Sequence, residues 1–181
     1  RNIEKQQKER IKKYMHEHKR EMTDFLMHLI RFRSINDINK GIGKELELQE
    51  WLRDELSEMG FDKIDYWAVD KNKVRPNIVV TIQGDGDGRS LIFNGHIDVV
   101  PVPEDQVKMW KEDPWKPVIK KGMVFGRGAT DMMGGITSMV WAAKALIDNN
   151  IKLKGNVYIE CVVGEESIEH TIGTSATVER G

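Results

Sequence analysis

Apolar residues at the start of the chain recur at three- and four-residue intervals. Over residues 4–32 they form one stripe, and the basic residues of the other face are interleaved with glutamates. This periodicity predicts one amphipathic helix whose polar face is solvated. A second helix is predicted around residues 48–59, because Gly60 follows it and glycine readily takes the left-handed conformation that ends a helix.

The pattern then changes to short strands. Residues 64–68 alternate, and the apolar runs 77–82 and 91–93 follow. The glycines and aspartates of residues 84–88 lie between these two runs and predict a hairpin turn. The order of these segments therefore predicts strands that are neighbours both in the sequence and in the sheet.

The second half of the chain alternates strands with a helix. Residues 123–125 form a short apolar run, a glycine-rich turn follows, and residues 135–148 place apolar side chains on one helical face. Residues 156–163 are almost continuously apolar, as expected for a strand covered on both faces. This alternation predicts an α/β layered domain.

Composition narrows the class of protein. The 181 residues suit one domain, and 28 basic against 29 acidic residues produce no overall field that would attract nucleic acid or an anionic membrane. No apolar stretch approaches the ~20 residues of a membrane-spanning helix. The single Cys161 cannot form an internal disulfide, which predicts a cytoplasmic protein. Because the chain starts at Arg1 and stops at Gly181 with no terminal element completed, we interpret it as a fragment.

Polar residues that packing does not require follow three of the predicted strands. His96 and Asp98 follow the first, Asp131 the second, and the Glu165–Glu166 pair the third. Ligands of α/β sheets gather beyond the carboxyl ends of strands, so we expect these three groups to converge.

Converging carboxylates and an imidazole would need a divalent cation to offset their charge. Imidazole and carboxylate ligands without a thiolate suit zinc, with cobalt or manganese also possible. Within the pair Glu165 and Glu166, one side chain can ligate metal while the other takes a proton from an activated water. Such a site hydrolyses amides.

Several motifs, in this order, resemble those of the cocatalytic zinc amidohydrolases and exopeptidases. This superfamily includes acetylornithine deacetylase, succinyl-diaminopimelate desuccinylase, aminoacylase and carboxypeptidase G. The motifs are residues 96–101, 110–115, 126–135, 165–166 and 173–174. The resemblance implies a three-layer α/β sandwich with a mixed, largely parallel central sheet, of which residues 1–181 would be the N-terminal portion of the catalytic domain.

The resemblance also implies a role for each polar residue. His96 would ligate one of two zinc ions, Asp131 would bridge both, and Glu166 would ligate the other. Glu165 would be the general base, and Asp98 would orient the imidazole of His96. The implied substrate is a small N-acyl amino acid or a short peptide, cleaved at a C–N amide bond, and the full-length protein would be a homodimer.

The family pattern has one further expected feature and two departures. A cis peptide is expected between Asp131 and Met132. Met133 stands where the family usually has a lysine, and the segment before Gly173 is about two residues longer and contains Glu169 and His170. A further acidic ligand, a late histidine ligand and the lid domain would lie beyond the chain, so we expect the fragment alone to be inactive.

Two other functions remain open from the sequence. Residues 126–131 mimic a dinucleotide-binding turn, although Asp131 stands where the third glycine belongs and its charge would oppose a pyrophosphate. Alternatively, a catalytically inactive relative would serve only as an interaction domain. Cys161 lies in an apolar strand and is interpreted as a core thiol.

Overall fold

The structure is a computed structural model that describes residues 2–37, 42–70, 75–167 and 171–181. The helices are α1 (Asn2–Glu17), α2 (Lys19–Arg31), α3 (Leu46–Glu58), α4 (Glu104–Val107), α5 (Gly134–Asp148) and α6 (Ile172–Arg180). The strands are β1 (Asn36–Asp37), β2 (Ile42–Gly43), β3 (Ile64–Asp70), β4 (Arg75–Ile82), β5 (Leu91–His96), β6 (Val118–Lys120), β7 (Met123–Phe125) and β8 (Val157–Val162).

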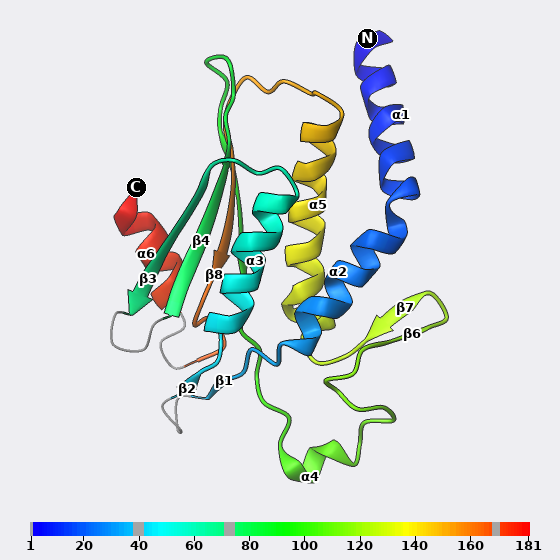
Figure 1. Ribbon diagram of the computed structural model, residues 1–181, viewed down its shortest axis with the longest axis vertical. Coiled ribbons are helices and arrows are strands. Elements are labelled where there is room, and N and C mark those ends of the chain that lie inside the picture. Colours follow the sequence, from blue (N-terminus) through cyan, green and yellow to red (C-terminus); the bar gives the residue numbers. More distant parts are fainter. Residues whose placement is uncertain (1, 38–41, 71–74, 168–170) are drawn as a thin grey trace.

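The central sheet has the strand order β3-β4-β8-β5 and lies between two layers of helices (Figure 1). Helices α3 and α5 cover one face, with α1 and α2 beside α5, and α6 covers the other. The predicted α/β sandwich with a mixed sheet is confirmed. Among the described strands β5–β8 is the parallel pairing, whereas β3–β4 and β4–β8 are antiparallel, so the parallel share is smaller than expected.

The predicted hairpin between β4 and β5 is wrong. Strand β8 lies between them and pairs with both. Residues 84–88 instead run beside the segment that leads into β8, where the Asp85 N–H donates to Leu153 O at 2.9 Å. The close approach needs glycine, because a β-carbon on Gly84 would lie 2.5 Å from the main chain of Gly155. One face of β8 is buried, with Val157, Ile159 and Cys161, whereas Tyr158 and Glu160 on the other face are only partly covered.

The predicted first helix is two helices that meet at His18. The backbone of His18 leaves the helical conformation (φ −97°, ψ 16°), and its Nδ1 lies 2.9 Å from Tyr14 O. The bend allows both helices to follow α5: Tyr14 donates a 2.6 Å hydrogen bond to Asp148, and Phe25 and Leu29 of α2 are buried.

The end of the chain also differs from expectation, because residues 172–180 complete helix α6. It packs very closely on the sheet: a β-carbon on Gly173 would lie 2.2 Å from Val163 O. The core holds Cys161, as predicted, with no exposed surface. Within the described residues, no helix is both long and apolar enough to cross a membrane.

Candidate metal centre

The candidate site lies where β5 and β8 end side by side. These strands are parallel, and His96, the last residue of β5, is in register with Val162, the last residue of β8. Their carboxyl ends therefore open at one edge of the sheet. Gly164 has φ +72°, a left-handed conformation that turns the chain just after β8 and leads Glu165 and Glu166 toward His96.

His96 is nearly buried and is held from both sides of its ring. Its Nδ1 lies 2.9 Å from the main-chain oxygen of Asp98, and its Nε2 lies 3.0 Å from Asp131 Oδ1. Burial lowers the pKa of the imidazole, but hydrogen bonds and charge from Asp98 and Asp131 outweigh it and raise the pKa to about 9. Without a metal, the ring is therefore a cation at neutral pH and donates on both sides.

Asp98 has a wider role than the sequence suggested. Its carboxylate lies 3.5 Å from His96 Nδ1, farther than its own main-chain oxygen. The same carboxylate accepts hydrogen bonds from the main-chain N–H groups of Glu165 (3.1 Å) and Glu166 (2.8 Å). Burial raises the pKa of Asp98, yet these bonds, His96 and Asn36 together hold it below its ordinary value. The ionised carboxylate thus connects the imidazole to residues 164–166, which we call the glutamate turn.

Asp131 reaches the site from the turn before α5. The preceding strand, β7, pairs with β6 in a separate small sheet, so Asp131 does not follow a strand of the central sheet as predicted. Residues 129–133 form an irregular turn, η2 (Ala129–Met133), and the expected cis peptide joins Asp131 to Met132. Gly128 has φ +80°, and a β-carbon there would lie 2.5 Å from Val99. This tight turn leaves the Asp131 side chain 72% exposed beside His96.

His96, Glu165 and Glu166 form a group whose potential ligand atoms lie within 4.8 Å of one another. Asp131 lies outside this group and touches it through His96. Burial raises the pKa of Glu166, and the charge of Asp131 adds to this effect. The carboxylates therefore repel one another, and a cation among them would relieve the repulsion.

The spacing of these atoms fits a metal ion. Two nitrogen or oxygen ligands about 2.0–2.2 Å from a tetrahedral zinc ion lie ~3.3 Å apart. The 3.0 Å between His96 Nε2 and Asp131 Oδ1 is close to that value. With Nδ1 turned to the main-chain oxygen of Asp98, His96 directs its other nitrogen to the acids, as a ligating histidine does. The structure therefore brings together all five residues that the sequence singled out.

Three supporting residues were missed by the sequence analysis. Asn36 Nδ2 donates to Asp98 at 3.2 Å, and it is brought there because residues 34–36 run beside residues 97–99. The buried Asn77 accepts the Val163 N–H at 3.1 Å, just before the glutamate turn. The third is Arg75, at the start of β4, whose guanidinium lies against Gly164. In the sequence, Arg75 and Asn77 could be noticed only as polar residues at the start of an apolar strand, and such a position does not indicate which residue the side chain contacts.

Of the residues that depart from the family pattern, the structure describes Met133. Met133 is 1% exposed and belongs to the core, so its apolar side chain suits this buried position. Glu169 and His170 lie outside the described residues.

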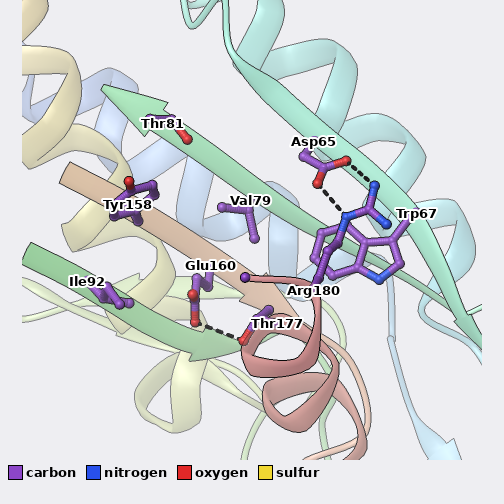
Figure 2. Close-up of a pocket in the computed structure, with 10 residues that line it drawn as sticks. Asp65, Trp67, Val79, Thr81, Ile92, Tyr158, Glu160, Thr177 and Arg180 are labelled. Atoms are coloured by element: carbon purple, nitrogen blue, oxygen red, sulfur yellow. Dashed lines mark hydrogen bonds and ion pairs between the residues drawn. The ribbon is translucent and has the colours of Figure 1, made fainter. Parts of the chain in front are cut away.

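A separate hollow of about 640 Å³ lies on the face of the sheet next to α6 (Figure 2). Arg180 of α6 lies over the ring of Trp67 there and forms a two-pronged ion pair with Asp65. None of the five candidate residues lines this hollow. It is therefore distinct from the candidate centre.

Comparison with known proteins identifies the family to which the candidate metal centre belongs. Residues 92–181 match the family described as "Peptidase family M20/M25/M40". The chain belongs to this family. The segment that matches the M20 family contains all five candidate residues, and the resemblance to metal-dependent amidohydrolases inferred from the motifs is confirmed.

One curated relative is N-formyl-4-amino-5-aminomethyl-2-methylpyrimidine deformylase of Bacillus subtilis. It is 35% identical over 171 residues, which are 93% of this chain and 37% of the relative. The chain therefore spans little more than a third of that enzyme.

Two solved structures share the fold. A dipeptidase of Saccharomyces cerevisiae, Dug1p, superposes with a TM-score of 0.77 at 20% identity, over 94% of this chain and 37% of that one. Sso-CP2 of Sulfolobus solfataricus, a metallo-carboxypeptidase of the M20 family, superposes with a TM-score of 0.70 at 27% identity, over 88% and 34%. The three-layer architecture is thus that of M20 peptidases.

Proposed function

We propose that this chain supplies part of the active site of a metal-dependent hydrolase that cleaves a C–N amide bond. The observation that carries the proposal is the convergence of His96, Glu165 and Glu166, with Asp131 at 3.0 Å from His96. Membership of the M20 family supports it. So do a deformylase and a metallo-carboxypeptidase among the similar proteins, because a formamide and a peptide share the C–N bond that is cleaved.

The proposed metal ligands are His96, Asp131 and Glu166, with Asp131 between two ions. Zinc suits this set best, and cobalt or manganese also accept nitrogen and oxygen ligands. When bound, such ions lower the pKa of water and polarise a carbonyl group. The remaining ligands of a two-metal centre are expected from parts of the full-length protein outside these residues.

Glu165 is the proposed general base. Its side chain is half exposed, and its Oε2 lies 3.7 Å from His96 Nε2, so it faces the space where water and substrate would meet. It would take a proton from the attacking water and pass it to the leaving nitrogen. Asp98 would keep His96 and the glutamate turn in place during both transfers.

The proposed substrate is a small N-acyl amino acid or a short peptide, and the full-length protein is proposed to be a cytoplasmic homodimer. The nucleotide-binding alternative is weakened by Asp131, whose carboxylate lies 3.0 Å from the imidazole and whose negative charge would oppose a pyrophosphate. A purely interacting domain would not need a buried imidazole aligned with three carboxylates.

The proposal is tested with the full-length protein and a panel of N-formyl and N-acyl amino acids and dipeptides. Hydrolysis of at least one class is expected, with loss of activity on chelation and recovery with zinc. Activity that survives complete metal removal would contradict the proposal. Saturable NAD or FAD binding without metal would favour the nucleotide-binding alternative instead.

A further inference from the structure

A buried ion pair lies next to Gly164, the first residue of the glutamate turn. Arg75 Nη2 donates to Glu45 Oε1 at 2.7 Å, and Arg75 Nε donates to Glu45 Oε2 at 3.3 Å. The two side chains are 2% and 0% exposed. Glu45 lies at the start of α3 and Arg75 at the start of β4, so the pair joins the helical layer to the sheet.

The guanidinium of Arg75 also packs against the turn itself. A β-carbon on Gly164 would lie 2.6 Å from Arg75 Nη2, so the arginine is in contact with the Gly164 backbone. The next two residues, Glu165 and Glu166, donate their main-chain N–H groups to Asp98. The turn therefore contacts Arg75 at Gly164 and Asp98 at the two residues that follow.

The pair is close enough to the site for Glu45 and Asp98 to interact electrostatically. Burial raises the pKa of Glu45, Arg75 lowers it, and the charge of Asp98 raises it further. Glu45 and Asp98 thus repel each other through the protein, and Arg75 offsets the buried charge of Glu45. Breaking the pair would leave an unpaired carboxylate behind the acidic centre.

A buried ion pair is a poor means of stabilising a fold, because desolvation of both charges cancels most of their attraction. An apolar pair of similar volume would fill the same space. An apolar pair would lack the planar guanidinium of Arg75, which a carboxylate fixes at two points and which packs against one backbone position. The location of this pair therefore favours a role in the geometry of the site.

We propose that Arg75 is a positioning residue: Glu45 holds its guanidinium against Gly164, and this contact sets the direction in which Glu165 and Glu166 leave β8. Its effect on metal binding rests on the proposed function, since that effect requires Glu166 to be a ligand. Its effect on the turn does not, and the two can be measured separately.

The test replaces both partners, in Glu45→Met/Arg75→Met, so that neither charge of this pair stays buried without the other. Amide hydrogen exchange of the metal-free full-length protein is expected to become about tenfold or more faster at Glu165 and Glu166, while the centre of β8 is unchanged. Zinc affinity is expected to fall about 10–100-fold, as when other supporting contacts of metal ligands are lost. Unchanged exchange at both glutamates would overturn the proposal.

The two measurements separate the two hypotheses. Faster exchange with unchanged zinc affinity would support the positioning role and contradict the assignment of Glu166 as a ligand. Arg180→Met is the matched control, because it removes an arginine that is also paired with a carboxylate at two points but is the last residue of α6 and pairs with Asp65 of β3. It is expected to change neither measurement.

A conservative variant covers the case in which the double variant does not fold. Arg75→Lys keeps the positive charge beside Glu45 but lacks the planar fork that packs on Gly164. It is expected to show the same faster exchange at Glu165 and Glu166. Exchange equal to that of the unaltered protein would overturn the proposal, because charge alone would then suffice.

Discussion

The Asp98 carboxylate accepts a 2.8 Å hydrogen bond from the main-chain N–H of Glu166. With the equivalent bond from Glu165, it fixes the turn that carries the proposed base and a proposed metal ligand. Two consecutive amides directed at one buried carboxylate form a local anion-binding arrangement. With His96 and Asn36, whose effects are larger, they hold the pKa of Asp98 below its ordinary value although the residue has no exposed surface. Asp98 is therefore the point at which the imidazole and the glutamates are aligned with each other.

Replacing Asp98 tests this alignment. In Asp98→Asn one acceptor oxygen becomes a donor, so one of the two glutamate N–H groups loses its partner. We expect metal affinity or activity to fall about 10–100-fold, measured by zinc competition titration and steady-state kinetics. Asp65→Asn, on the far side of the sheet, is the control. Unchanged zinc affinity together with unchanged activity would dismiss the role of Asp98.

Removing the proposed base should separate turnover from metal binding. Glu165→Ala is expected to keep its zinc and to lose about 10²–10⁴-fold in kcat, because the attacking water would lose its proton acceptor. Zinc content and kcat of the full-length protein check this, with Glu58→Ala at the end of α3 as the control. Loss of zinc with activity intact would contradict both assigned roles.

The raised pKa of His96 predicts how pH affects the metal-free protein. Between about 6.5, the value for an unfolded chain, and about 9, the folded state keeps a proton that the unfolded state has lost. The stabilisation is therefore complete below pH 6.5, and the free energy of unfolding falls as pH rises toward 9. Urea unfolding across this range measures the slope.

His96→Gln should flatten that slope, since no imidazole is left to titrate at this position. Saturating zinc should remove it as well, because a ligating nitrogen carries no proton. A slope of the same size in the His96→Gln variant would show that another group is responsible.

The turn before Asp131 should tolerate no side chain at Gly128. Gly128→Ala must adopt φ +80° and would also place its β-carbon 2.5 Å from Val99 Cγ1. We expect a loss of about 1–3 kcal/mol in the free energy of unfolding by urea denaturation. Gly60→Ala is the matched control: its φ is +91°, but a β-carbon there has no atom within 4 Å, so it should cost less. Equal costs would mean that the contact with Val99 is unimportant.

Local patterns predicted much of the scaffold. Helices α3 and α5 and strand β8 were identifiable because their side-chain periods are local properties of a helix or a buried strand. The candidate residues were identifiable for a similar reason: His96 and Glu165 follow apolar runs at positions where packing has no use for a charge. Their type and order sufficed to predict a metal site.

Long-range pairing could not be predicted in the same way. The sequence places the β4 and β5 segments next to each other, but β8, over 60 residues later, inserts between them and pairs with both. Short-range spacing carries no information about such a pairing. Helix α6 was missed because its stability comes from the close contact of Gly173 with Val163 and not from a strong helical pattern of its own.

By itself, the sequence singled out the candidate residues for the chemistry and most of the helical and extended segments, since both follow from residue type and short-range spacing. Only the tertiary structure decided how those residues are held. The contacts of Asp98 with the glutamate turn, and of Arg75 with Gly164, join residues 67 or more positions apart in the chain. No local pattern encodes such contacts, because they form only when the sheet and its helices have packed together.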